Sequence, residues 1–247
     1  PCIYEGIFNF SDSLFIVVKR DNYKQLSDRN GAIVNDSLYQ EIHQEINGYA
    51  ICIKGDKIGY LDKQGKRLIE NKFDGYVDYD VLGNFLNNRA VAFSNQKFGV
   101  INTDGEFVVK PKYDNIRNLG HSFGVSKNGK WALMDSSYNI ISKYDHESIE
   151  LINNNYILFG KNGKFGVMDL KLNVFIDALY SSIYKLGDFL ILENDLGNAL
   201  YDFGGNEILS FDQWAFYNAD MNFLKVIDLE SGIIQKYIDK QTGQVIS

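Results

Sequence analysis

The residues best suited to chemistry in this 247-residue chain begin with a serine flanked by glycines. Residues 120–124 read Gly-His-Ser-Phe-Gly, a pattern in which a nucleophilic serine sits between a strand and a helix. The residues after Ser122 instead continue a strand-and-turn pattern that recurs along the chain, and the only later histidine is His146. We therefore interpret residues 120–124 as a turn.

Other candidate groups are equally isolated. Ser94 and Lys97 have the Ser-x-x-Lys spacing of some acylating enzymes, but Lys97 occupies a lysine position that recurs in other repeats. The histidines His43, His121 and His146 show none of the paired spacings of metal ligands. We therefore assign no catalytic residue and no histidine metal site.

Acidic residues recur at one position of the sequence pattern and could be considered as calcium ligands. They are Asp28, Asp62, Asp135, Asp169, Asp202 and Asp239. A calcium loop needs a dense cluster of oxygen ligands, as in Asp-x-Asp-x-Asp-Gly, and these acids stand alone. We interpret them as turn-capping residues, and we predict no bound metal and no cofactor, since no phosphate-binding glycine loop is present.

These residues belong to a unit of about 34 residues that repeats along the whole chain. Two clear copies are residues 128–135, Asn-Gly-Lys-Trp-Ala-Leu-Met-Asp, and 162–169, Asn-Gly-Lys-Phe-Gly-Val-Met-Asp. The last residue of each copy falls at 28, 62, 102, 135, 169, 202 and 239, with spacings of 34, 40, 33, 34, 33 and 37. We therefore predict one repeat domain of seven units over residues 1–247.

Each unit is expected to form antiparallel strands. An Asx-x-x-Gly turn follows several of these positions, as at 62–65 and 102–105, and an apolar pair such as Leu68-Ile69 comes next. The Asx side chain caps such a turn, and the glycine supplies a positive φ. An apolar run and an aromatic residue precede each turn, so we predict three strands per unit, with room for a short fourth.

One segment also fits a helix. Leu38, Ile42 and Ile46 have helical spacing after Asp36, a possible N-cap. Tyr39 and Ile42, however, match positions of units that show no helical pattern, so we favour the strand interpretation.

Composition agrees with β-structure and limits the partners. Aromatic residues make up 14% of the chain, and there are only two prolines and two cysteines, too few for a disulfide framework. A net charge of −7 disfavours nucleic acid as a partner. The apolar run at 14–18 is too short to cross a bilayer, so we predict no membrane insertion. Nothing here indicates a compartment.

The repeat resembles the WG-repeat, or KWG-repeat, of bacterial proteins. Residues 97–116 carry the resemblance best, with Lys-Phe-Gly-Val-Ile-Asn-Thr-Asp-Gly followed by Val-Val-Lys-Pro-Lys-Tyr-Asp-Asn-Ile. No copy has Trp followed by Gly, since Trp131 precedes Ala132. The resemblance implies an interaction module or scaffold without a shared active site.

Seven units can close into a ring or continue as an open array. We predict an all-β fold closed as a seven-bladed propeller-like ring, because propellers usually have four to eight blades and closure removes exposed edges. Residues 1–20 supply the element that would follow Ser247 in the repeat cycle, a phase expected of a ring latched by its first strands and equally of seven whole units cut from a longer array. The alternative is an open β-solenoid array.

These observations favour a non-enzymatic module that binds a protein, peptide or glycan through its loop faces. The alternative is a hydrolase or lyase with a site on the central face of a propeller. Insertions in repeat proteins form loops that often bind, and the long spacings place them at 76–89 and 213–222. Our candidate contact residues there are Tyr76, Tyr79, Arg89, Trp214, Phe216 and Tyr217.

Overall fold

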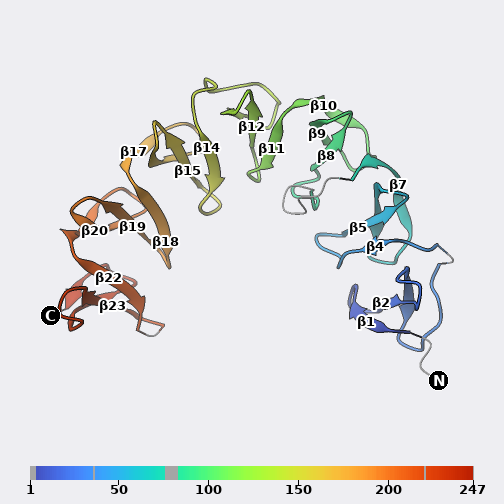
Figure 1. Cartoon of the computed structure of the whole chain (residues 1–247), viewed down its shortest axis with the longest axis horizontal. Helices are drawn as coiled ribbons and strands as arrows, with labels where there is room; N and C mark the ends of the chain where they lie inside the picture. Colours follow the sequence, from blue (N-terminus) through green and yellow to red (C-terminus); the bar gives the residue numbers. More distant parts are fainter. Residues whose placement is uncertain (1–3, 36, 76–82, 220, 247) are drawn as a thin grey trace. The chain divides into compact units, whose positions relative to one another are not determined.

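A computed structural model describes residues 4–35, 37–75, 83–219 and 221–246 of the chain. All regular elements in these residues are β-strands, which form seven antiparallel sheets, three of three strands and four of four. Each sheet is built from consecutive strands, so each takes one interval of the colour scale in Figure 1. The prediction of an all-β chain with seven repeated units is confirmed.

The first four sheets hold strands β1 to β13. Their bounds are β1 Gly6–Asn9, β2 Leu14–Val18, β3 Lys24–Asp28, β4 Glu41–Ile42, β5 Tyr49–Lys54, β6 Lys57–Asp62, β7 Arg67–Asp74, β8 Ala90–Ser94, β9 Lys97–Ile101, β10 Phe107–Tyr113, β11 Asn115–Asn118, β12 Phe123–Lys127 and β13 Lys130–Met134. The sheets are β1 to β3, β4 to β7, β8 to β10 and β11 to β13.

The last three sheets have four strands each. Their bounds are β14 Ser148–Leu151, β15 Tyr156–Lys161, β16 Lys164–Asp169, β17 Val174–Tyr180, β18 Ser182–Leu186, β19 Phe189–Asn194, β20 Gly197–Asp202, β21 Glu207–Asp212, β22 Trp214–Asn218, β23 Phe223–Asp228, β24 Ile234–Asp239 and β25 Val245–Ile246. The sheets are β14 to β17, β18 to β21 and β22 to β25.

The chain forms two compact units. One contains residues 1–128 and 134–139, and the other contains 129–133 and 140–247. The single domain over residues 1–247, and the choice between a closed ring and an open array, stay predictions.

The predicted turns lie where the repeat places them. At Asp62, Oδ1 accepts hydrogen bonds from the amides of Gln64 and Lys66, at 2.9 and 2.8 Å, and the Gly65 amide donates to the Asp62 carbonyl. A main-chain bond back to the corresponding acidic or amide residue closes the same turn after 28, 102, 135, 169 and 202, and a turn one residue longer after 239. The interpretation of the repeated acids as turn caps is confirmed.

The small residue after each repeated aromatic has a packing reason. A Cβ on Gly99 would lie 2.5 Å from the Val109 carbonyl, and one on Gly166 would lie 2.5 Å from that of Ile176. These close approaches occur where the pairing of β9 with β10 and of β16 with β17 shifts register. Ala132 takes this position in β13, the last strand of its three-stranded sheet.

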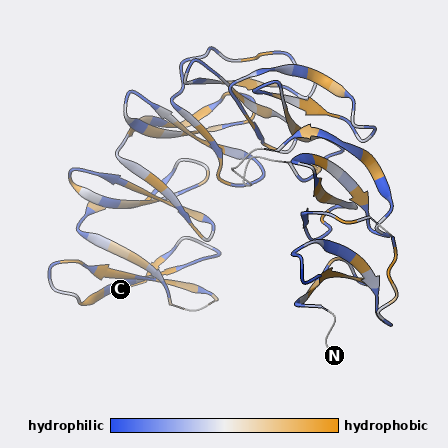
Figure 2. Cartoon of the chain, turned by 45° about the vertical axis from the view of Figure 1, so that its right-hand side comes forward, coloured by the Kyte–Doolittle hydropathy of each residue, from blue (hydrophilic) through white to orange (hydrophobic). Residues whose placement is uncertain are grey.

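The central strands are buried on both faces. In β5, Ala50 and Cys52 pack with Ile16 and Leu26 of the first sheet, whereas Ile51 packs with residues of the third. This arrangement explains the continuous apolar runs that mark each repeat. Figure 2 shows these hydrophobic runs on the strands and hydrophilic residues around the turns. Trp131 shares one repeat position with Phe98 and Phe165, which predicts a core residue, and its side chain is 8% exposed.

A repeated carboxylate joins neighbouring sheets. Asp114, after β10, pairs with Lys97 of β9, and its other oxygen accepts from the Asn128 amide, 2.6 Å away, in the turn after β12. Asp74 likewise pairs with Lys57 and accepts from the amide of Asn95. Glu147 joins Lys130 to the amide of Gly163 in the same way. We call these three carboxylates the inter-sheet clamps.

The helical alternative for residues 36–46 is not realised in its described part. Residues 41–42 form β4, and the main chain of Tyr39 bonds to that of Lys24 on β3. Asp36, the candidate N-cap, lies outside the described residues.

Candidate functional site

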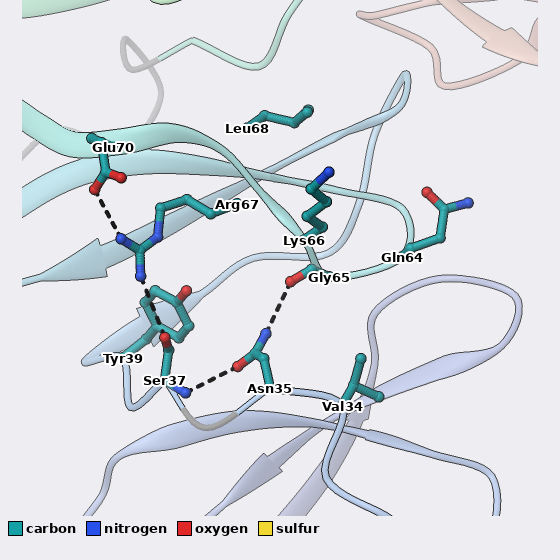
Figure 3. Close-up of a pocket in the computed structure, with 10 residues that line it drawn as sticks. All are labelled: Val34, Asn35, Ser37, Tyr39, Gln64, Gly65, Lys66, Arg67, Leu68 and Glu70. Carbon is teal, nitrogen blue, oxygen red and sulfur yellow. Dashed lines mark hydrogen bonds and ion pairs between the residues drawn. The ribbon is translucent and has the colours of Figure 1, made fainter.

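A groove of about 520 Å³ lies between the first two sheets of the first unit. One wall is formed by Val34, Asn35, Ser37 and Tyr39, which follow the Ser27–Ile33 bridge and end at the Lys24–Tyr39 bridge. The other wall is residues 64–70, from the turn after β6 into β7 (Figure 3). We call this the β7 groove.

Hydrogen bonds hold the two walls together. Asn35 Nδ2 donates to the Gly65 carbonyl at 2.9 Å, and Asn35 Oδ1 accepts from the Ser37 amide at 3.3 Å. Figure 3 shows Arg67 reaching both Glu70 and Ser37, with distances of 2.8 Å from Nη1 to Oε2 and 3.4 Å from Nη2 to Oγ. The bonds with Glu70 raise the pKa of Arg67, which therefore stays cationic. Hydrogen bonds thus fix the positions of the polar groups that line the groove.

Apolar side chains line the same groove. Val34 and Leu68 are 42% and 46% exposed, although both belong to the apolar pairs that follow the repeated turns. Ile69, the partner of Leu68 in its pair, packs inward at 2% exposure, whereas Ile33, the partner of Val34, is 37% exposed. No described residue forms a hydrogen bond or ion pair with the Lys66 ammonium group. The groove therefore presents aliphatic surface next to a free cation.

The main chain of β7 adds a further feature. β7 is the last strand in the order β4-β5-β6-β7, so its outer edge has no neighbouring strand within its sheet. Such an edge offers main-chain donors and acceptors to an extended segment of another chain. The groove can therefore hold a peptide by backbone bonds, apolar contacts and one charge.

The candidate residues from the first expected insertion fall in different places. Tyr76 and Tyr79 lie outside the described residues. Arg89 lies in a separate small pocket of the first unit, where its Nε donates to the Tyr138 hydroxyl. Arg89 is therefore not a β7 groove residue.

The prediction of a loop insertion at 213–222 is wrong. Residues 214–218 form the regular strand β22, and the extra residues lie at 229–233, between β23 and β24. Five of the other repeats connect the corresponding strands with two residues, such as Gly55 and Asp56, whereas residues 19–23 connect β2 to β3. The sequence spacing located the long unit but could not place the extra residues within it.

The three aromatic candidates on β22 differ in environment. Phe216 is 9% exposed and packs in the core with Val226. Trp214 is half-buried, and its Nε1 donates to the Ser210 carbonyl at 3.2 Å. Tyr217 is 51% exposed, with Lys225 Nζ 5.6 Å from its ring centre. Trp214 and Tyr217 retain surface that a partner could contact, whereas Phe216 is a core residue.

The groups considered for catalysis remain apart. Strand β12 begins directly after Ser122, where a nucleophile elbow would have a helix. Burial lowers the pKa of both His43 and His146. Within the described ranges, no three His, Cys, Asp or Glu residues gather as a metal site. Among the same residues, no helix is long and apolar enough to cross a membrane.

Sequence reasoning missed the β7 groove because its residues occupy ordinary repeat positions. The Asn35–Gly65 bond joins residues of different repeats, and no spacing reveals it. One missed signal was visible, since Tyr138 stands where the turns ending at Gly31, Gly65 and Gly105 have glycine.

Comparison with solved structures gives distant similarities. Hsv2 of Kluyveromyces lactis is 10% identical, with 94% of this chain and 91% of that chain covered and a TM-score of 0.48. BamB from Moraxella catarrhalis is 11% identical, with 94% and 84% covered and a TM-score of 0.43. The WD40 domain of Neurospora crassa Pan2 is 13% identical, with 90% and 85% covered and a TM-score of 0.38.

Sequence comparisons are more specific. No curated protein matches this chain. The family described as WG containing repeat matches residues 1–23 and 98–131. The resemblance inferred from the repeated residues is therefore confirmed, and the chain contains WG-type repeats in these two segments.

Proposed function

We propose that this protein is a non-enzymatic interaction module and that the β7 groove binds an extended segment of a protein partner. The observation that carries the proposal is the free edge of β7 beside exposed Val34 and Leu68. Strand addition at an edge supplies affinity through the main chain, and neighbouring pockets supply specificity through side chains.

The groove chemistry indicates which segment it takes. Leu68 and Val34 suit an aliphatic side chain, and the ammonium group of Lys66 suits an acidic one. Protein sites for glycans commonly stack sugars on exposed aromatic rings, but Tyr39, the one aromatic side chain among the described residues of the groove, is 1% exposed. We therefore favour a peptide with alternating acidic and aliphatic residues over a glycan.

The contact residues expected from the sequence belong to the same proposal as additional surfaces. Arg89, Trp214 and Tyr217 have exposed or half-exposed side chains, and Tyr76 and Tyr79 are retained from the sequence pattern. No observation on the described residues favours the hydrolase or lyase alternative.

The test uses a random-peptide phage library panned on the intact chain. We expect enriched peptides to carry Asp or Glu next to Leu, Ile or Val. Fluorescence anisotropy with a selected peptide should show that Leu68→Glu weakens binding about tenfold or more, because a like charge and lost apolar contact oppose the ligand.

The matched control is Val108→Glu, which places the same charge at the equivalent apolar position of the next repeat. This variant should bind the peptide like the unmodified chain. Equal affinity of both variants and the unmodified chain, or enrichment of peptides without acidic residues, would contradict the proposal.

A further inference from the structure

A second pocket, of about 130 Å³, lies in the first unit and is separate from the β7 groove. Arg89, His121, Phe123, Ser136 and Tyr138 contribute to its lining. Arg89 directly precedes β8, His121 lies in the turn before β12, Phe123 begins β12, and Ser136 and Tyr138 lie in the turn after β13. Two neighbouring sheets, β8 to β10 and β11 to β13, thus bring a guanidinium, an imidazole and two hydroxyl groups to one small cavity.

The guanidinium group of Arg89 is held in place on one side. Its Nε donates to the Tyr138 hydroxyl, and its Nη1 donates to the Asn88 carbonyl at 2.9 Å. Its central carbon lies 5.9 Å from the centre of the Tyr138 ring. No described residue forms a hydrogen bond with Nη2. The outer edge of the guanidinium group therefore keeps free N–H groups that can bind an oxyanion.

Tyr138 itself has an unusual backbone. Its φ is +68°, in the left-handed region that glycine occupies in the equivalent turns at Gly31, Gly65 and Gly105. A bulky residue is disfavoured there, and such strain is often found at functional sites. Its ring packs on Phe123, with centroids 6.3 Å apart, so the strained residue forms a wall of the pocket.

We propose that this pocket binds a carboxylate, presented by an aspartate or glutamate side chain of a protein partner. A planar guanidinium edge matches the two oxygens of a carboxylate, and His121 and Ser136 offer further donors. Phosphoryl recognition commonly uses several arginines, and this pocket has one. The inference shares only the class of partner with the proposed function.

The test is an NMR titration of the intact ¹⁵N-labelled chain with acetyl-aspartate amide. Acetyl-asparagine amide at the same ionic strength is the neutral control. We expect saturable shifts of the Arg89 Nε–Hε signal and of the amides around His121 with the aspartate probe alone. Equal shifts with both probes, or stronger binding of acetyl-phosphoserine amide, would overturn the carboxylate assignment.

Variants separate binding from folding. Arg89→Lys keeps the positive charge but loses the planar guanidinium group with its paired N–H donors. It should weaken binding of the aspartate probe by about tenfold. Leu68→Glu, in the β7 groove, should leave this titration unchanged, so the two proposals can fail independently. Probe binding by Arg89→Lys that equals the unmodified chain would contradict the assigned role.

The strained turn provides the second test. Tyr138→Gly removes a pocket wall and relieves the positive φ, so the melting temperature should hold or rise while probe binding is lost. Leu172→Gly is the matched control, since Leu172 has a φ of +72° in the next repeat and does not line this pocket. It should keep probe binding. Unchanged binding in Tyr138→Gly would refute the proposal, whatever its stability.

Discussion

At the scale of single residues, one acidic or amide side chain organises each repeat. Its carboxylate or amide oxygen accepts main-chain amide bonds across the turn, as Asp62 does from Gln64 and Lys66. This function requires only a short side chain with an acceptor oxygen at the first turn position. Asn102 can therefore replace aspartate in the third repeat.

Removing one of these caps should destabilise the fold locally. We expect Asp62→Ala to lower the free energy of unfolding by about 1 kcal/mol, because two amide donors lose their partner. Urea denaturation followed by circular dichroism measures this change. Asp62→Asn keeps the acceptor and should be close to neutral; a loss as large as that of alanine would mean that charge, not the turn bonds, stabilises the site.

Substitution of a core residue should lower the free energy of unfolding by more than the loss of a turn cap does. Trp131 is 8% exposed, so Trp131→Ala should leave a cavity and lower the free energy of unfolding by about 3–5 kcal/mol. Tyr217→Ala, at a 51% exposed position, should change it by only about 0.5 kcal/mol. Similar losses for both variants in thermal and urea unfolding would show that the assigned burial is wrong.

Residue-level prediction from the sequence succeeded where a residue type has one physical role. The turn acids and the buried tryptophan could be identified because their chemistry recurs with the repeat. The sequence did not distinguish the buried Phe216 from the exposed Tyr217. Adjacent residues of a strand face opposite sides, but the sequence predicts a loop where β22 forms. The groove contact of Asn35 with Gly65 depends on the packing of two repeats and has no local signal.

At the scale of elements, the three inter-sheet clamps link the second sheet to the third, the third to the fourth and the fourth to the fifth. Asp114 joins the side chain of Lys97 to the amide of Asn128, and Glu147 joins Lys130 to Gly163. Hydrogen bonding from Lys97 holds the pKa of Asp114 below its ordinary value, and the amide of Gly163 does the same for the pKa of Glu147. The charged forms are thus favoured in the folded chain.

These lowered pKa values give stability a defined pH dependence. The unfolded state has the higher carboxyl pKa, near 4, so it binds more protons as the pH falls. The stabilisation should be complete above about pH 5 and decrease from about pH 4 downward. Asp114→Asn should be less stable at pH 7 and should lose less stability between these values, as measured by urea unfolding at each pH. A slope equal to that of the unmodified chain would contradict the role of this clamp.

The elements themselves were largely predictable. Turn residues and apolar runs recur with the repeat, so strands such as β5, β6 and β7 follow from the pattern. The clamps were not predicted, because Lys97 and Asp114 are 17 residues apart and each fits a solvent-exposed position. The location of the extra residues at 229–233 also escaped prediction, since a spacing between turns does not show which connection is longer.

At the scale of the whole molecule, the sequence predicts closure through its first strands. A closed ring requires the strands within residues 4–20 to pair with or pack beside the hairpin at 233–246. Deleting residues 1–20 should then cause cooperative unfolding of the entire chain, whereas an open array would lose one repeat. Calorimetry of the truncated chain distinguishes the two, and a melting transition like that of the full chain would exclude the ring.

The central claim is that the β7 groove is a partner-binding surface, and chemical-shift mapping tests it most directly. The intact ¹⁵N-labelled chain is titrated with a peptide selected from the phage library. We predict the largest amide shifts at Val34, Asn35, Ser37 and Tyr39 and in residues 64–70, with slower exchange of the β7 edge amides as the peptide adds a strand. Saturable binding whose shifts fall on other sheets, while these two segments stay unperturbed, would contradict the account.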